Sequence, residues 1–527
     1  MANKITKIVT AAAVLATLVA PQAALAAAPA PTLKNDNPTA KNGDWYVGAT
    51  PSNVDTSKPV ILFVQGLHSD YTTWYNSDGF YDAAYNAGYR TAFVQLKDAD
   101  GAGGTMWENG STLAGVITKV KNYYGVSKIN IVAHSKGGID TQTALVHYGA
   151  YPYVNLVHQL STPNRGSELA DMAYSTWTSW LASILGQKDD ATYVLQTSYM
   201  DYFRSVTDGR SENNYTRTYM SGGSGDDGVF SATFYSRAFL PGEDDGAVAI
   251  YSAFGLPNGY YGFEDNGSER LSHTKMRWAS KTWWQVRPKL TTTSYYGVTG
   301  SALASSTSYM AKKAVDESSS NIMRGGEING QAVDTFTLEK GTKANIDVMT
   351  SKLGTNVKLV SPSGKEYLPT TGKAQQDDAV LFADAVHNSF EIKGEAGTWS
   401  LIAEGNADAY FMVAAVEGGS KSNVKAAKKN FKKGEKVDLT VALQGGKADQ
   451  KSKKQLKAKL SKSGKQAAQD VALNVNADGS IASSFTAPTE PGIYNVSFDV
   501  DGINANGEAF TRSVNYNFAV LDENGKL

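Results

Sequence analysis

The pattern of hydrophobic and polar positions changes once along the chain, shortly after Pro288. Before that point, runs of consecutive apolar residues alternate with stretches in which apolar residues recur every three or four positions. The runs are typical of strands buried on both faces, and the spaced pattern is typical of amphipathic helices. This alternation predicts an α/β domain over residues 40–290, with a mostly parallel sheet flanked by helices. The expected strands are 59–64, 90–96, 128–132, 154–160 and 215–220, with a closing helix over 272–286 that Pro288 stops.

The second half of the chain favours strands throughout. Short runs that alternate apolar and polar residues lie between turns rich in Gly, Ser and Thr. We expect a β-sandwich module resembling a jelly roll over 300–418 and an immunoglobulin-like β-sandwich over 421–527. The Gly-Gly-Ser-Lys stretch at 418–421 is interpreted as the linker between them.

The N-terminus has the pattern of an export signal. Lys4 and Lys7 precede an apolar stretch at 8–20 that is too short to span a bilayer, and small residues follow at 24–28. The pattern predicts a signal peptide over 1–28 and a secreted, extracellular product, either free or associated with the cell surface.

Composition narrows the chemistry further. The 527 residues include no cysteine, which excludes disulfides, thiolate metal ligands and a cysteine nucleophile. The net charge of −1 gives no global indication of nucleic-acid binding, so no nucleic-acid partner is expected.

A candidate nucleophile lies between an expected strand and an expected helix. The sequence Ala133-His134-Ser135-Lys136-Gly137 places a serine between small residues, two before it and two after it. Small residues at these positions allow a sharp strand-to-helix turn that exposes the serine hydroxyl. The following helix N-terminus would supply N–H groups for a developing oxyanion.

This motif resembles that of the bacterial secreted triacylglycerol lipases and esterases of the α/β-hydrolase superfamily, which carry A-H-S-x-G. The resemblance covers about residues 44–290 and leaves out the two C-terminal modules. It implies that the backbone N–H groups of Leu67 and Lys136 form the oxyanion hole. Gln65 stands where the family has His, and Asn164 replaces another His in the segment after the fourth strand.

Elimination among six histidines leaves His273 as the general base. The others lie beside the nucleophile, on the oxyanion loop, on the next helix, in an expected strand or in the C-terminal half. His273 follows the last expected strand and precedes the closing helix, in keeping with the order Ser, acid, His that this fold uses.

Two acidic turns compete for the third role. Asp245, with Gly246 and Val248, matches the family's Asn-Asp-Gly-x-Val segment, while Asp227 follows the fifth strand more closely. We expect Asp245 to be the acid and keep Asp227 as the alternative. These acidic loops could also hold a structural calcium ion, but the chemistry itself requires no cofactor and no metal.

An apolar helical stretch follows at 174–185. Its Trp177, Trp180 and Leu181 are the expected substrate-binding residues, on either a mobile lid or a fixed cap. In the last module lysine dominates from 421 to 465, which indicates either a solvated face or contact with an anionic surface such as a cell wall.

Together these features predict a secreted serine hydrolase that cleaves lipid esters, a triacylglycerol lipase whose substrate can lie at an oil–water interface. The alternatives are a short-chain carboxylesterase or polyester depolymerase, and a non-catalytic surface adhesin built on a hydrolase-like fold.

Overall fold

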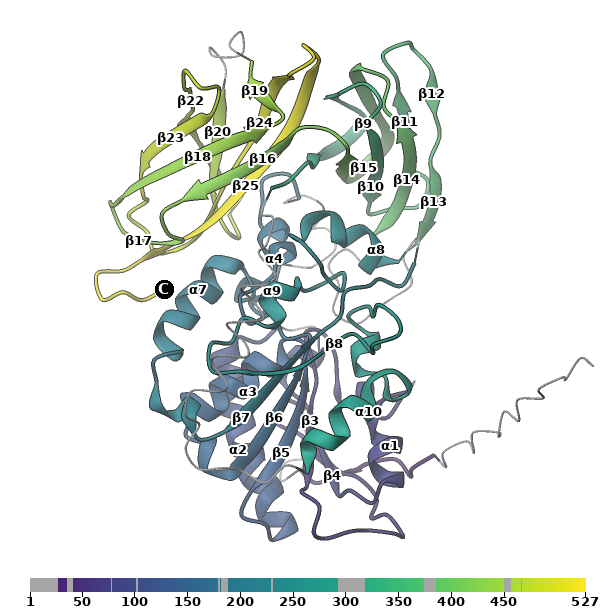
Figure 1. Cartoon of the computed structure of the whole chain (residues 1–527), viewed down its shortest axis with the longest axis vertical. Coiled ribbons are helices and arrows are strands. Elements are labelled where there is room, and N and C mark those ends of the chain that lie inside the picture. Colours follow the sequence, from purple (N-terminus) through teal and green to yellow (C-terminus); the bar gives the residue numbers. More distant parts are fainter. Residues whose placement is uncertain are drawn as a thin grey trace, which may run out of the picture.

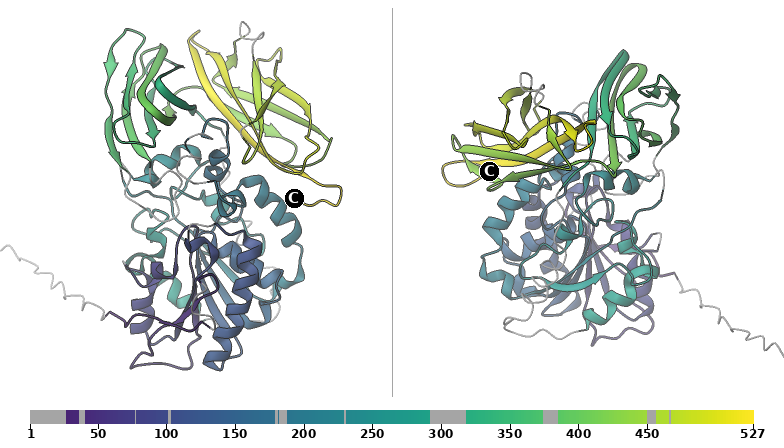
Figure 2. Two further views of the ribbon diagram at one scale, coloured as in Figure 1. Left: turned by 180° about the vertical axis from the view of Figure 1, so that it is seen from behind. Right: turned by 45° about the horizontal axis from the view of Figure 1, so that its top comes forward.

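A computed structural model of the chain describes residues 27–35, 41–76, 78–100, 103–178, 181, 188–228, 231–291, 318–373, 385–449, 456–465 and 467–527. Most of the expected signal peptide and Trp180 therefore lie outside the described residues. Two β modules lie side by side at one end of an α/β domain (Figures 1 and 2).

The α/β domain is built on one eight-stranded sheet in the order β1-β2-β4-β3-β5-β6-β7-β8. From β4 to β8 neighbouring strands pair in parallel, and β1 and β2 add an antiparallel edge. The strands are β1 (Thr32–Leu33), β2 (Trp45–Val47), β3 (Ile61–Val64), β4 (Thr91–Val94), β5 (Ile129–His134), β6 (Val154–Leu160), β7 (Arg217–Gly222) and β8 (Tyr260–Glu264).

Helices cover both faces of this sheet. On one face α2 (Met106–Tyr124) and α3 (Gly137–Val146) share a buried cluster with the strands, in which Leu113, Ile117 and Val120 repeat at helical spacing. On the other face α1 (Phe80–Asn86) and α10 (Ala279–Leu290) pack against Phe63 and Phe93. The α/β-hydrolase architecture expected from the sequence is confirmed.

The closing helix differs from its prediction. It begins at Ala279 and contains Pro288, which was expected to stop it. The prediction was wrong because a proline in the last turn removes only one late hydrogen bond of the helix and does not prevent the turn from forming.

Shorter elements connect β6 to β8. They are α4 (Glu168–Ala173), α6 (Asp190–Tyr193), α7 (Thr197–Thr207), η4 (Ser211–Asn214), α8 (Ala232–Ser236), η5 (Arg237–Phe239) and α9 (Ile250–Ala253). The remaining single turns are η1 (Tyr71–Trp74), η2 (Lys97–Asp100), η3 (Tyr151–Tyr153) and η6 (Lys275–Arg277). No helix in the described part of the chain is long and apolar enough to cross a membrane.

Module one, which follows the α/β domain along the chain, contains a single seven-stranded sheet that curves around one core. Its strands are β9 (Ile322–Leu338), β10 (Lys343–Thr350), β11 (Asn356–Val360), β12 (Glu366–Tyr367), β13 (Thr370–Lys373), β14 (Val386–Lys393) and β15 (Gly397–Glu417). A bulge at Ala407, whose φ is 51°, shifts the alternation of β15. Trp399 and Leu401 before the bulge and Met412 and Val416 after it therefore face the same core.

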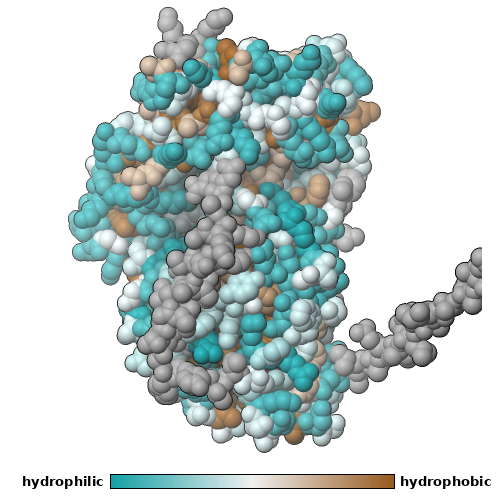
Figure 3. Space-filling model, in the orientation of Figure 1, coloured by the Kyte–Doolittle hydropathy of each residue, from teal (hydrophilic) through white to brown (hydrophobic). Residues whose placement is uncertain are grey.

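Module two packs a four-stranded sheet on a six-stranded one. The strands are β16 (Lys421–Ala426), β17 (Asn430–Lys432), β18 (Lys436–Gln444), β19 (Gly446–Ala448), β20 (Lys457–Lys462), β21 (Ala468–Ala472), β22 (Asn474–Val475), β23 (Ile481–Thr486), β24 (Gly492–Asn504) and β25 (Ala509–Leu521). Much of its lysine charge is offset by carboxylates, as in Lys428–Glu435 and Lys459–Asp470. In the face shown in Figure 3 the outer surface of the modules is mostly hydrophilic, with scattered apolar residues.

A buried ion pair joins the two modules. The guanidinium of Arg512 on β25 lies 2.8 and 3.1 Å from the two carboxylate oxygens of Glu339, which follows β9. Arg512 also donates to the carbonyl of Ser420 between the modules, and both side chains of the pair are almost fully buried. The modules are therefore fastened to each other by a charged contact that water does not reach.

We expect Arg512→Leu to destabilise the module pair by about 3–5 kcal/mol, because it leaves the Glu339 carboxylate buried without its partner. The melting temperature measured by calorimetry should fall markedly. Lys457→Met, which removes one partner of an exposed pair with Asp470, is the control and should change it little. Equal melting temperatures for both variants would contradict this account of the module interface.

Candidate active site

Ser135 stands on a strained turn between β5 and α3. Its φ is 53°, a left-handed conformation that non-glycine residues rarely adopt. The Ser135 N–H donates to the carbonyl of Leu160 at the end of β6, 2.9 Å away, which holds the turn at the edge of the sheet.

Glycines make room for this turn. A Cβ at Gly137 would lie 2.2 Å from the carbonyl oxygen of Gln65, and one at Gly66 would lie 2.9 Å from the Ser135 Cβ. Neither contact is possible without movement of the backbone. The small residues recognised in the sequence are therefore required by the close approach of the loop after β3 to the turn after β5.

His273 and Asp245 form the central polar contact of the site. His273 Nδ1 lies 2.9 Å from Asp245 Oδ2, and both side chains are buried, with exposures of 0% and 1%. The other carboxylate oxygen accepts the N–H groups of Ala247 and Val248 at 3.0 and 2.8 Å. The carboxylate is thereby fixed, and with it the orientation of the imidazole.

The second nitrogen of His273 is left without a partner. Its Nε2 is buried and makes no hydrogen bond to any described residue. A buried nitrogen without a hydrogen bond destabilises the fold, so it calls for an explanation such as a catalytic role. A neutral imidazole held by a carboxylate on Nδ1 presents Nε2 as a proton acceptor.

His134 packs against His273. The two rings lie 4.6 Å apart, and His134 Nε2 is 3.0 Å from the carbonyl oxygen of His273. Burial holds the pKa of His134 well below its usual value, so this ring stays neutral. It therefore supports His273 without placing a second positive charge beside it.

Asp227, the alternative acid, lies near the base but does not contact its ring. Its carboxylate accepts a hydrogen bond from Ser272 at 2.6 Å and pairs with Lys275 at 3.0 Å. The structure thus brings Asp245, rather than Asp227, onto His273.

Two backbone N–H groups flank Ser135. Leu67 and Lys136 are both buried, and neither N–H has a hydrogen-bond partner among the described residues. The Gln65 side-chain amide, in the orientation that satisfies both of its ends, bonds to Val94 O and Leu96 N, each at 2.7 Å. Gln65 therefore ties the loop that carries Leu67 to β4.

A small, mainly apolar pocket opens at Ser135, with a free volume of about 30 Å³. Its lining is Leu67, Ser135, Pro163, Ser167, Leu169, Ala170, Thr192, Leu195, Ala247 and Val248. Trp177 and Leu181, expected at the substrate, do not line it. They belong to an apolar cluster shared with module one, because that module packs on the segment after α4.

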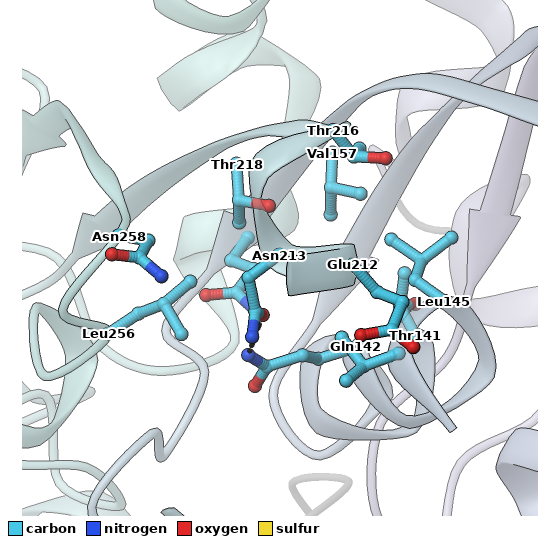
Figure 4. A pocket seen from close by; sticks show the side chains of 12 residues that line it. Thr141, Gln142, Leu145, Val157, Glu212, Asn213, Thr216, Thr218, Leu256 and Asn258 are labelled. Carbon is cyan, nitrogen blue, oxygen red and sulfur yellow. Dashed lines mark hydrogen bonds between the residues drawn. The ribbon is translucent and has the colours of Figure 1, made fainter. Parts of the chain in front are cut away.

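Sequence reasoning missed most of this lining. Thr192 and Leu195 come from the insertion between β6 and β7, where no motif marks them. A separate cavity beneath α3 is too small to be a substrate site (Figure 4). Lined by Gln142, Glu212 and Asn213 among others, it has a free volume of about 20 Å³, room for about one water molecule.

The described residues contain no group of three or more His, Asp or Glu side chains arranged to hold a metal ion. The acidic turns expected to offer calcium ligands are otherwise engaged, since Asp226 and Asp244 both pair with Arg237. Burial raises the pKa of Asp244 to about 7 in spite of that arginine. Calcium binding at these turns stays a prediction.

No family model matches the chain. A curated relative, triacylglycerol lipase 2 of Saccharomyces cerevisiae, is 31% identical over 102 residues, which are 19% of this chain and 31% of that protein. The chain thus matches less than a third of that relative's length.

Solved structures give a longer match. Lipase BlEst2 of Bacillus licheniformis in propeptide form is 27% identical, with a TM-score of 0.70, over 92% of this chain and 99% of that one. The mature form of the same lipase is 37% identical, with a TM-score of 0.43, over 48% of this chain and all of the other. With its hydrolase sheet, its serine turn and this likeness, the chain belongs to the lipases and esterases of the α/β-hydrolase superfamily, which are carboxylic ester hydrolases.

Proposed function

We propose that the chain cleaves lipid esters through a triad of Ser135, His273 and Asp245, by way of an acyl-enzyme. The observation that carries the proposal is the buried His273–Asp245 contact, which leaves a free Nε2 on the base. His273 packs against His134, the neighbour of a serine held on a left-handed turn at the end of β5.

In the first step Ser135 Oγ attacks the ester carbonyl carbon while His273 Nε2 takes the hydroxyl proton. The imidazolium that forms is stabilised by Asp245, and the charge on the carbonyl oxygen is received by the N–H groups of Leu67 and Lys136. His273 then gives its proton to the departing alcohol. In the second step water, activated by the same base, attacks the acyl-enzyme and releases the carboxylic acid.

The lining of the pocket favours an acyl group. Leu67, Leu169, Leu195 and Val248 offer apolar contact, and only a few hydroxyl groups interrupt it. Triacylglycerols are the substrate class we propose, with short-chain esters and polyesters as the alternative. The export signal at the N-terminus supports secretion, which is part of the same proposal.

We further infer that this chain is a closed precursor. The solved structure that matches nearly its whole length is described as a propeptide form. In this chain Ser135 is only 4% exposed and His273 is fully buried. A substrate the size of a triacylglycerol cannot reach them without movement.

The β modules pack on the walls of the Ser135 pocket. Ile493 and Ala519 of module two join the apolar cluster that contains Leu67 and Leu195. Met323, Phe411 and Val413 of module one join the cluster that contains Leu169 and Leu181. The same side chains therefore line the pocket and contact the modules, so docking of the modules restrains the pocket.

Polar contacts fix the docked position of module two. Asn517 Nδ2 and Ser463 Oγ both donate to the Gln196 side chain, at 3.1 and 2.8 Å. Tyr193 accepts the backbone N–H of Ile493 at 3.1 Å, and Lys429 donates to Thr197 at 2.7 Å. Gln196, Tyr193 and Thr197 belong to the stretch from α6 to the start of α7, which also supplies Thr192 and Leu195 to the pocket.

Ser135→Ala should abolish hydrolysis of p-nitrophenyl esters and of a triglyceride emulsion, with a loss of about 10⁴-fold or more in kcat. The matched control Ser205→Ala, which removes a hydroxyl near the surface of α7, should retain parental activity. Activity on long acyl chains and on the emulsion supports the lipase assignment. Activity confined to short esters replaces it with the esterase alternative, and a fully active Ser135→Ala rules out the mechanism.

Asp245→Asn should reduce kcat by about 10³–10⁴-fold, because an amide cannot stabilise the imidazolium and favours the wrong tautomer of His273. Asp227→Asn is the matched control, since its carboxylate lies on the same side of the site but contacts Ser272 and Lys275. We expect it to retain most of the activity. If the two variants exchanged their effects, the acid would be Asp227.

Limited proteolysis that separates residues 27–291 from the modules should raise kcat/KM by at least about tenfold, corresponding to about 1.4 kcal/mol of closure. In the intact chain Phe411→Asp should do the same in part, because it introduces a charge into the apolar contact under module one. Val333→Asp, on an exposed position of β9, is its control and should have no effect. Equal activity before and after release would show that the modules do not restrain the site.

A further inference from the structure

A buried cluster of charges lies directly behind the candidate oxyanion hole. The ammonium of Lys136, the residue after Ser135, is 0% exposed and lies 3.0 Å from Asp98 Oδ2 and 3.1 Å from both oxygens of Asp140. Asn109 donates to both carboxylates, at 2.6 and 3.0 Å.

Stability alone does not explain this cluster. Burying an ammonium and two carboxylates carries a desolvation cost that their attraction often fails to exceed, and apolar side chains of similar volume are commonly as stable or more so. The cluster contains two carboxylates and only one ammonium. Burial raises the pKa of Asp140, although the positive charge of Lys136 acts to lower it. A role beyond stability is therefore required of it.

The cluster joins the serine turn to three segments around it. Asp98 belongs to η2 after β4, Asn109 to α2, Lys136 to the turn itself and Asp140 to the first turn of α3. Asp98 also accepts the N–H of Gly104 at 3.1 Å, which fixes the loop between η2 and α2. Movement of Lys136 would break contacts with two neighbouring elements at once, η2 and α3.

The backbone of Lys136 is where this anchoring matters. Its N–H follows the left-handed Ser135 and has no partner among the described residues, while its own side chain is held at the far end. A peptide group beside a strained residue is free to rotate unless its neighbours restrain it. An oxyanion donor contributes fully only when it is fixed before the charge appears.

We propose that Lys136 is a positioning residue of the oxyanion hole, whose buried ammonium, held between Asp98 and Asp140, fixes the backbone N–H that receives the oxyanion. The proposal rests on the proposed function, because it presupposes chemistry at Ser135. Lys136 does not contact the reacting atoms with its side chain. It acts on the reaction through its own peptide group.

The second donor has a similar support. His68 follows Leu67, has a φ of 50° and pairs with Asp189. Although burial alone would lower it, the Asp189 carboxylate raises the pKa of His68, which favours the charged pair. Asp189 in turn packs against Gly103 of the loop that Asp98 holds. The side chain of Lys136 and the side chain next to Leu67, His68, are therefore both ion-paired. Their acidic partners both contact the loop that contains Gly103 and Gly104.

The test uses the intact full chain, measured side by side with the parent. Lys136→Met/Asp140→Asn removes the ammonium together with one carboxylate, so that the net charge of the cluster is unchanged. Lys97→Met, which removes an ammonium from a solvent-accessible pair with Glu108, is the matched control. Lys136→Gln is a second variant, whose amide can still donate to one carboxylate.

We expect the double variant to lose about 10²–10³-fold in kcat, the usual effect of losing one oxyanion donor, with a nearly unchanged KM. The rate at which a p-nitrophenyl phosphonate labels Ser135 should fall in the same proportion, because that adduct also places an oxygen in the hole. Lys136→Gln should show both losses in weaker form. The Lys97→Met control should keep kcat within about threefold of the parent, which corresponds to less than about 0.7 kcal/mol.

Parental kcat and labelling rate in a folded double variant would overturn the proposal. Unfolding of both Lys136 variants would also overturn it, because the cluster would then be needed for the fold rather than for placing the donor. The proposed function fails by a different result, namely activity in Ser135→Ala. A dead Ser135→Ala combined with a fully active double variant would leave the function standing and remove only the role of Lys136.

Discussion

The left-handed backbone at Ser135 is the constraint on which the rest of the site depends. A non-glycine residue in this conformation costs on the order of 1–3 kcal/mol, and it persists only where its surroundings hold it. Here the sheet fixes the residue through Leu160, and Gly66 and Gly137 leave space for it. The turn lifts the serine side chain off the sheet edge and leaves the next N–H unpaired. In the proposed mechanism, one backbone feature thus provides both the nucleophile and an oxyanion donor.

Enclosure is the second constraint, and it acts in two directions. A base and acid buried together interact strongly because water does not screen them, which is an advantage once substrate is bound. The same burial keeps substrate out. The modules increase the enclosure by packing on Leu67, Leu169 and Leu195, side chains that also line the pocket. Because amide and hydroxyl groups supply much of the contact with module two, the surfaces retain polar groups that water can satisfy after separation.

The local parts of this arrangement could be predicted from the sequence. The apolar run before Ser135, the small residues around it and the chain order of serine, acid and histidine each depend on neighbours within a few positions or on a known order. Asp245 and Asp227 are both Asp-Gly turns, and only the family pattern favoured Asp245. What could not be predicted is non-local. Leu195 reaches the pocket by way of an insertion without a motif, and Trp177 is drawn into an interface with a module whose docking no local pattern encodes. Pro288 failed as a stop signal because its position within the helix, rather than its presence, decides the effect.

The departures from the family pattern indicate where side-chain identity matters. Gln65 and Asn164, which stand where the family has histidines, both act through amide hydrogen bonds: Gln65 to β4, and Asn164 to Gln159 and the carbonyl of Ala253. Each ties a loop of the site to a neighbouring segment. Gln65 both donates and accepts, whereas Asn164 donates only through its amide nitrogen, so these positions need hydrogen-bonding groups rather than titratable ones. His273 differs from them in being held by a buried carboxylate through one nitrogen, with the other left unpaired in the core. An unpaired nitrogen alone does not mark a base, because His158 and His387 also bury one, so it is the position of His273 against His134, the neighbour of the serine turn, that separates the proposed base from them.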